Sequence, residues 1–121
     1  MNREQFENRT KAFALRIIRL VESLPRGRTN DVIERQLLRS GVSVGANYRA
    51  ACRAKSARDF VSKMGIVEEE SDEAIYWIEL LVESGKLRGE LVKGLLAEGR
   101  ELLAMSVASI KTARARRIAK G

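Results

Sequence analysis

Six polar side chains at helical spacing are the best candidates for chemistry: Gln36, Ser40, Ser43, Asn47, Glu70 and Glu73. Paired carboxylates of this kind can carry out general acid–base catalysis or bind a divalent metal ion. The chain contains no histidine, whereas di-metal sites in helical bundles usually combine Glu from several helices with Glu-x-x-His motifs. We therefore expect a non-enzymatic protein, with no catalytic residue, no metal and no cofactor.

The alternative role for these polar residues is structural. A polar group on the packing side of a helix needs a hydrogen-bond partner once it is buried. We predict that Asn47, Ser40 and Glu73 form a buried hydrogen-bond network that fixes the register of neighbouring helices. The full set assigned to this structural network is Gln36, Arg39, Ser40, Ser43, Asn47 and Glu73.

A second group of candidates consists of basic residues, in which Arg outnumbers Lys. The Arg guanidinium can donate two parallel hydrogen bonds to one phosphate, so an Arg-rich surface favours nucleic acid. Arg49 and Arg53 are four residues apart and share one helix face, whereas Arg39 is assigned to an ion pair within the fold. The candidate nucleic-acid-binding residues are Arg16, Arg19, Arg26, Arg28, Arg35, Arg49, Arg53, Lys55 and Arg58.

The charge of the chain changes sign twice along its length. The net charge is +7, composed of +8 in residues 1–58, −7 in residues 59–85 and +6 in residues 86–121. The basic parts could attract nucleic acid. Alternatively, oppositely charged helices lie side by side or pair across subunits, and the sequence leaves both interpretations open.

The N-terminal residues, the lack of a long apolar run and the single cysteine together favour a cytoplasmic protein. The N-terminal residues carry charges throughout, which is unlike a signal peptide. No run of about 18 apolar residues is present, so we expect no membrane span. The single cysteine, Cys52, cannot form a disulfide within the chain.

The spacing of apolar residues predicts four helices, at about residues 2–23, 31–54, 57–83 and 89–113, in one domain that covers residues 1–113. Residues 114–121 form a basic tail that we expect to fray. Four long helices with short connections favour an all-α, up-down-up-down four-helix bundle.

Apolar residues spaced by three and four define the packing side of each helix. We expect inward-facing residues to include Phe13 and Ile17 in the first helix, Leu37 and Asn47 in the second, Met64 and Ile78 in the third, and Leu91, Leu95, Leu102, Met105 and Ser109 in the fourth. Gly41 and Gly45 each weaken a helix interior, so we predict that they let another helix approach closely. Ile18, Val21, Ile66 and Trp77 lie off these lines, and a monomer would expose them, which predicts an oligomer.

Several short elements carry a family resemblance, namely Leu24-Pro25, Gln36-Leu37, Arg39-Ser40, Ser43-Val44, Asn47, Ser56, Asp59-Phe60, Glu73 and Tyr76-Trp77. With these elements, the chain resembles the four-helix-bundle proteins encoded in intervening sequences of 23S ribosomal RNA genes. These proteins are related to the accessory variability determinant of diversity-generating retroelements. Two positions depart from the family pattern: Ala50 stands where many members have Glu, and Glu70 where many have a small residue such as Ser.

The resemblance implies a bundle that assembles into a ring-like homo-oligomer, commonly a pentamer, with basic surfaces and no catalytic activity. The relationship to proteins of retroelements implies binding to nucleic acid and to a reverse transcriptase. We therefore expect a binding or scaffolding protein that contacts itself and RNA, DNA or a protein–nucleic-acid complex. The alternative is a protein–protein adaptor whose charge asymmetry serves self-assembly only.

Overall fold

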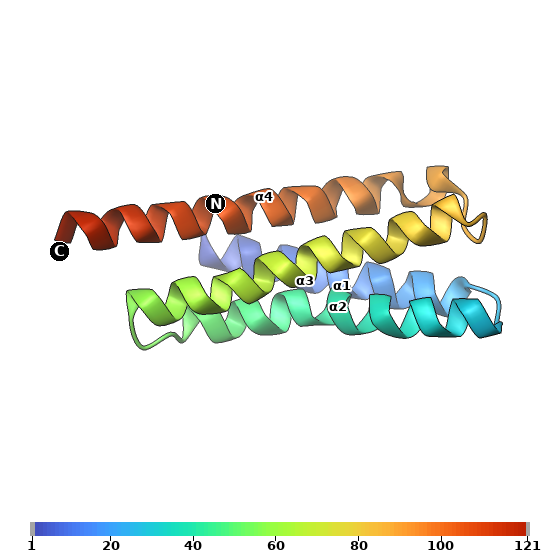
Figure 1. The fold of residues 1–121 in the computed structure, drawn as a ribbon, viewed down its shortest axis with the longest axis horizontal. Helices are drawn as coiled ribbons and strands as arrows, with labels where there is room; N and C mark the ends of the chain where they lie inside the picture. The colour runs from blue at the N-terminus through green and yellow to red at the C-terminus, as the bar shows by residue number, and fades with distance from the viewer. Residues whose placement is uncertain (1, 121) are drawn as a thin grey trace.

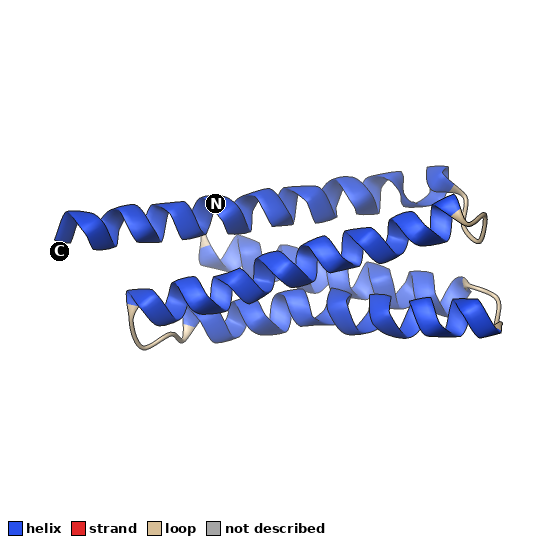
Figure 2. Ribbon diagram, in the orientation of Figure 1, coloured by secondary structure: helices blue, strands red, loops and turns tan. Residues whose placement is uncertain are grey.

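The computed structural model describes residues 2–120, and the side chains of residues 2–118. Within this range the chain is all-helical, with four helices and no strand (Figure 2). The helices are α1 (Arg3–Ser23), α2 (Arg28–Cys52), α3 (Ala57–Glu83) and α4 (Gly89–Lys120). They pack side by side as a bundle, with α2 against α1 and α3, and α4 against α3 and, less extensively, α1 (Figure 1).

Local hydrogen bonds explain where α1 and α3 begin and where α3 ends. The Asn2 side chain accepts a hydrogen bond from the Gln5 backbone N–H, and the Gln5 side-chain oxygen accepts one from the Asn2 backbone N–H, which is a capping box. Ser56 likewise accepts from the Asp59 N–H and caps α3. Gly85 follows α3 with a φ of +80°, a conformation that glycine adopts readily.

The second helix begins earlier than the sequence predicted, at Arg28 rather than near residue 31. Asn30 lies inside the helix and is buried, and its side chain donates to the Pro25 carbonyl at 2.9 Å. Gly27 occupies the N-cap position, and its carbonyl accepts from the Asp31 N–H at 2.8 Å. The side chain of Asn30 therefore binds to the loop between α1 and α2 instead of capping α2.

The core is one continuous cluster to which all four helices contribute. Its fully buried members include Phe13, Ile17, Leu37, Met64 and Leu102. In α1, α2 and α3, most of the predicted inward-facing residues are buried. In α2 the exception is Asn47, which is half-buried, while the neighbouring Tyr48 is buried and packs on Phe6 with ring centroids 4.2 Å apart.

The predicted packing side of α4 is wrong in three positions. Leu91 is 72% exposed, and Val92 is buried in its place. Farther along, Ser106 and Ile110 are buried where we expected Met105 and Ser109. Adjacent apolar residues in this helix fit two helical phases equally well, so the apolar pattern alone does not choose between them.

The last part of α4 also differs from the sequence prediction. Residues 114–120, which we assigned to a fraying tail, continue the helix, whereas Gly121 lies outside the described residues. This segment extends past the turn between α2 and α3 at the left of Figure 1. The side chains of residues 114–118 are all exposed, so the helix continues there without core contacts.

Candidate functional site

Arg39 on α2 is the centre of a polar cluster that links α2 to α3. Its guanidinium donates to both carboxylate oxygens of Glu70, at 3.1 and 3.2 Å, and to one oxygen of Glu73. It also donates to the side-chain oxygen of Gln36 at 3.3 Å, and Trp77 donates its indole N–H to Glu73 at 3.4 Å. The hydrogen bond to Glu73 and, after it, the one to Glu70 raise the pKa of Arg39. Glu70, which departs from the family pattern, is thus a partner of Arg39.

The remaining members of the predicted network do not join this cluster. Ser40 donates to the Gln36 carbonyl at 2.9 Å, Ser43 donates to the Arg39 carbonyl, and Asn47 donates to the Ser43 carbonyl at 2.8 Å. These are contacts to the preceding turn of the same helix, a common way for Ser to satisfy its hydroxyl inside a helix. The predicted single buried network of Asn47, Ser40 and Glu73 is therefore wrong, because the first two bond within α2.

The acidic helix α3 lies between two helices that supply basic partners. Arg39 reaches it from α2, and Arg100 of α4 pairs with Glu79 at 3.3 Å. Side-by-side packing of oppositely charged helices therefore accounts for part of the charge pattern. It does not account for all of it, because Glu69, Asp72 and Glu83 are exposed and have no ion-pair partner among the described side chains.

A further ion pair joins the first helix to the last. Arg9 donates to Glu98 through Nε, at 2.9 Å, and through a second nitrogen, and it also contacts Glu101 at 3.0 Å. The hydrogen bond with Arg9 holds the pKa of Glu98 below its usual range, against the effect of partial burial. The sequence analysis missed this pair, because two residues 89 positions apart give no local signal.

The predicted basic residues separate into groups, the first of which lies near the loop between α1 and α2. Arg26 and Arg35 line a hollow of about 590 Å³ together with the acids Glu22, Asp31 and Glu34. Arg26 lies 3.8 Å from Asp31. This surface has mixed charge, which weakens its attraction for phosphate. Two further candidates lie on α1, namely Arg16, which is beside Gly94 of α4, and the exposed Arg19. A third, the exposed Arg28, lies at the start of α2.

A second group lines the groove between α1 and α2, which we call the α1–α2 groove. Arg49 and Arg53 face it from α2, Arg3 and Lys11 face it from α1, and its volume is about 760 Å³. Glu7 is its one acidic lining residue, and it is paired with Arg3 at 3.1 Å. Between the charged residues lie small or apolar side chains, namely Ala14, Val42, Ala46 and Ala50.

A third group lies at the end of the bundle where α2 turns into α3. Lys55 lies in this turn and Arg58 at the start of α3. The turn is at the same end of the bundle as the C-terminal part of α4 (Figure 1). We call the following set of exposed residues the basic end: Lys55, Arg58, Lys111, Arg114, Arg116 and Arg117. None of the six forms an ion pair among the described side chains.

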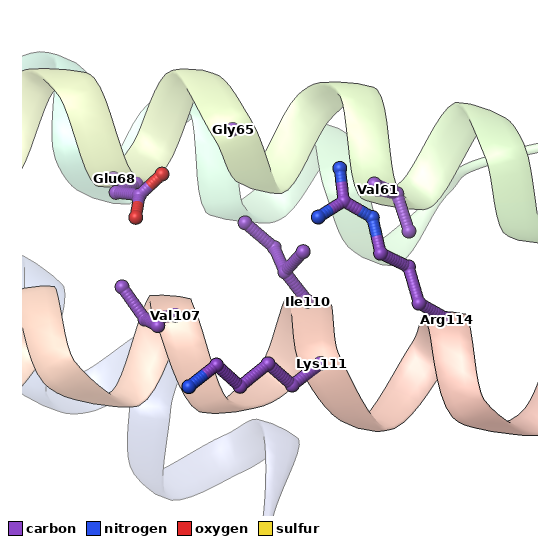
Figure 3. Close-up of a pocket in the computed structure, with 7 residues that line it drawn as sticks. All are labelled: Val61, Gly65, Glu68, Val107, Ile110, Lys111 and Arg114. Atoms are coloured by element: carbon purple, nitrogen blue, oxygen red, sulfur yellow. The ribbon is translucent and has the colours of Figure 1, made fainter.

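The hollow beside the basic end is small. It lies between α3 and α4, has a volume of about 170 Å³, and is lined by Val61, Glu68, Ile110, Lys111 and Arg114 among others (Figure 3). A drug-sized ligand usually needs about 300 Å³ or more. Among residues 2–120, no three His, Cys, Asp or Glu side chains are grouped so that they could hold a metal ion. No helix in the described part of the chain has the length and apolar character to cross a bilayer.

Comparisons with known proteins give a matching family model and a similar crystal structure. The model of the 23S rRNA-intervening sequence protein family matches residues 4–108. A crystal structure of a protein of unknown function from the S23 ribosomal protein family of Bacteroides thetaiotaomicron is 32% identical, with a TM-score of 0.84, and the match covers 92% of this chain and 99% of that one. No match is found among curated proteins. The family model spans most of all four helices, so this chain belongs to the 23S rRNA-intervening sequence protein family.

Proposed function

We propose that this chain is a non-enzymatic, oligomeric binding or scaffolding protein of the cytoplasm that contacts RNA or DNA through the basic end. The oligomer is a ring-like assembly, with a pentamer favoured by the family resemblance stated above. The resemblance to the accessory variability determinant of retroelements supports the same partner class.

The observation that carries this proposal is the accumulation of unpaired cations at one end of the bundle. Lys55 and Arg58 come from the α2–α3 turn and the start of α3, and Lys111, Arg114, Arg116 and Arg117 come from the C-terminal part of α4. All six side chains are exposed. Residues 102–121 contain no acidic residue. Cations from two separate segments therefore reach the same end without neighbouring carboxylates in α4 to neutralise them.

Such a surface would recognise the phosphate backbone rather than the bases. Phosphate contacts release condensed counterions, so binding would weaken steeply with salt and vary little with sequence. The helical extension of α4 beyond the bundle would present Arg116 and Arg117 away from the other helices. A ring would repeat the basic end once per subunit, and weak contacts would then add up to useful affinity.

Arg26, one of the nucleic-acid-binding candidates predicted from the sequence, is less suited to phosphate contact than the basic end is. Arg26 lies in a hollow with three acids, whereas the residues of the basic end have no ion-pair partner in the described part of the chain. We therefore move the proposed contact surface to the basic end. Arg26 and Arg28 lie at the opposite end of the helices, so they offer a matched control.

The test is binding of fluorescent single-stranded and duplex RNA and DNA of unrelated sequences at about 50 to 200 mM salt. In a variant with Lys55→Ala, Arg58→Ala, Arg114→Ala and Arg117→Ala, we expect affinity to fall for all sequences and the salt slope to fall by about one per lost contact. The control variant, Arg26→Ala with Arg28→Ala, should keep most of the affinity. Absence of binding at low salt, or equal loss in both variants, would contradict the basic end as the contact surface.

The second candidate function is a protein–protein adaptor. It is favoured by the ion pairs that Arg39 and Arg100 make with acidic residues of α3. These pairs account for part of the charge asymmetry without nucleic acid. Capture of the tagged full-length chain from its host, before and after nuclease treatment, separates the two functions. A protein partner that remains bound after nuclease treatment, together with no nucleic-acid binding by the purified chain, would support the adaptor.

A further inference from the structure

The outer face of α3 combines exposed apolar and acidic side chains. Ile66 is 39% exposed and Tyr76 is 52% exposed, and both lie on the side of α3 that points away from the core. Glu69 and Asp72 are exposed between them and form no ion pair with any described side chain. We call this surface, with Ser62 and Glu83 at its ends, the α3 outer face.

The spacing of these residues makes the α3 outer face continuous. Ser62, Glu69, Tyr76 and Glu83 are seven residues apart and therefore lie on one line along the helix, with Ile66 and Asp72 on either side of it. From Ser62 to Tyr76 the line is roughly 21 Å long. The surface thus has an apolar and aromatic component with carboxylates at its centre.

The α1–α2 groove has the opposite chemistry. Four cations, Arg3, Lys11, Arg49 and Arg53, and the single acid Glu7 surround a floor that includes Ala14, Val42 and Ala46. The groove has no bulky side chain on this part of its floor, and Gly45 contributes none at all. From Val42 to Arg53 the α2 side of the groove is roughly 16 Å long, so a helix face of the length of the α3 outer face can cover it.

We propose that the α1–α2 groove of one subunit binds the α3 outer face of a second copy of this chain. Arg49 and Arg53 would then face Glu69 and Asp72 of the second copy. Val42 and Ala46, which lie on one side of these cations along α2, would cover one of the two residues that flank the carboxylates, Ile66 or Tyr76. Both surfaces lie on one chain but are different from each other, so the contact is heterologous and can close into a ring. This inference rests on the self-assembly in the proposed function and adds the surfaces that form it.

The same assignment separates two roles among the basic residues. Arg49 and Arg53 belong to the subunit contact, whereas Lys55, Arg58 and the C-terminal part of α4 remain available to nucleic acid. Opposite charges across the contact set its register and suppress wrong pairings. The buried aromatic and apolar side chains supply most of the affinity, as in other interfaces with a few dominant residues.

Charge reversal tests the assignment on the full-length chain by sedimentation equilibrium. Arg49→Glu with Arg53→Glu, and separately Glu69→Lys with Asp72→Lys, should each raise the subunit dissociation constant by about tenfold or more, because like charges would meet. The chain that carries all four substitutions should assemble again, since its charges are exchanged and complementary. The control is Lys86→Glu with Arg88→Glu in the connection between α3 and α4, which should leave assembly unchanged.

Cross-linking gives a second readout that a merely structural role would not affect. In a Cys52→Ser background, a chain with Ala46→Cys is mixed with a chain with Glu69→Cys, and a short bismaleimide is added. A heterologous contact predicts cross-linked dimers in the mixture and few in either chain alone. Circular dichroism and thermal unfolding of each variant show whether it has kept its fold.

The outcomes distinguish this inference from the proposed function. A parent chain that remains monomeric at high micromolar concentration overturns both the self-assembly and the face assignment. An oligomer that persists in both charge-reversed variants overturns the face assignment and leaves the self-assembly standing. Loss of RNA binding in Arg49→Glu with Arg53→Glu, with assembly unchanged, also overturns the face assignment. It would assign the α1–α2 groove to nucleic acid.

Discussion

The side chain of Ile17 on α1 lies directly against Gly41 on α2 and leaves no space for a β-carbon there. One turn further along α2, a β-carbon on Gly45 would lie 3.0 Å from the Thr10 hydroxyl oxygen. The prediction that these two glycines permit close approach of another helix is confirmed. The consequence is that α1 and α2 pack closely together, and Thr10 and Gly45 also line the α1–α2 groove.

The first prediction concerns Gly41→Ala. Alanine usually stabilises a helix interior by about 1 kcal/mol relative to glycine, but overpacking against Ile17 costs about 1–3 kcal/mol. We expect a net decrease in the free energy of unfolding, measured by urea denaturation. Gly65→Ala is the matched control, because nothing lies within 4 Å of a β-carbon built there. It should be neutral or stabilising, and equal destabilisation in both variants would disagree with the helix–helix contact.

The second prediction concerns the pH dependence of the Arg9–Glu98 pair. Arg9 lowers the pKa of Glu98 in the folded chain, so the pair adds stability above the ordinary value of 4.5 and loses it as the pH falls through the folded value. Glu98→Gln should therefore cost about 1–2 kcal/mol at neutral pH, and this cost should shrink as the pH falls through the folded pKa of Glu98. Glu101→Gln is the control, because its side chain is two-thirds exposed and should contribute little. A cost for Glu98→Gln that does not change with pH would contradict this.

The third prediction concerns Glu34, whose pKa is shifted in the opposite direction to that of Glu98. Burial, and then the nearby charge of Asp31, raises the pKa of Glu34, and one of its carboxylate oxygens is buried without a hydrogen-bond partner. A raised folded pKa means that the ionised form destabilises the fold above the ordinary value of 4.5. Glu34→Gln should therefore raise the thermal midpoint at neutral pH, with a gain below about 1 kcal/mol, and the gain should vanish in acid. A loss of stability at neutral pH would show that the carboxylate is favourably placed.

The fourth prediction compares Arg39 with Arg35, one turn before it on α2. Arg39→Ala removes the partner of Glu70 and Glu73, whereas the Arg35 side chain only contacts the Asp31 carbonyl of its own helix at 3.4 Å. Because Arg39 is half-exposed, its loss should cost about 0.5–1 kcal/mol, and Arg35→Ala less. Trp77 fluorescence should change only in the Arg39 variant, since Trp77 donates to Glu73.

The fifth prediction concerns the C-terminal part of α4. Deletion of residues 114–121 should leave the free energy of unfolding within about 0.5 kcal/mol, because residues 114–118 are exposed. Ile110→Ala, a few residues earlier, should cost about 2–5 kcal/mol because Ile110 is buried. In the same deletion, nucleic-acid affinity should fall. A strong loss of stability on deletion would place this segment in the packing of the subunit.

The positions of the helices could be predicted because their end signals are local. Ser56 and Gly85 lie at the ends of α3, and the predicted range of 57–83 coincides with the observed one. The phase of α4 could not be predicted in this way, because Leu91-Val92 and Leu102-Leu103 offer apolar residues in two phases. Gly99 explains the observed phase. A β-carbon built at Gly99 would lie 3.1 Å from the Ile75 side chain and 3.4 Å from the Phe13 ring, so this side of α4 faces these two residues.

The candidate site was less predictable than the fold because its partners are distant in sequence. The sequence indicated that Arg39 makes an ion pair, and the structure supplies both of its acidic partners. It could not show that Arg26 lies among three acids while Lys55 and Arg58 lie near the end of α4. That difference depends on which helix ends meet, and only the three-dimensional arrangement determines it.

The order of the helices around the bundle also has a consequence for folding kinetics. Each helix packs mainly on the one that precedes or follows it in the chain, and α1 meets α4 least extensively. Contacts between neighbouring segments need little loop closure, so a chain of this topology should fold within microseconds to milliseconds. The pair of α1 and α2 can form as soon as both have left the ribosome, followed by α3. Both surfaces of the proposed subunit contact would thus exist before α4 has docked, and Arg9 would meet Glu98 last.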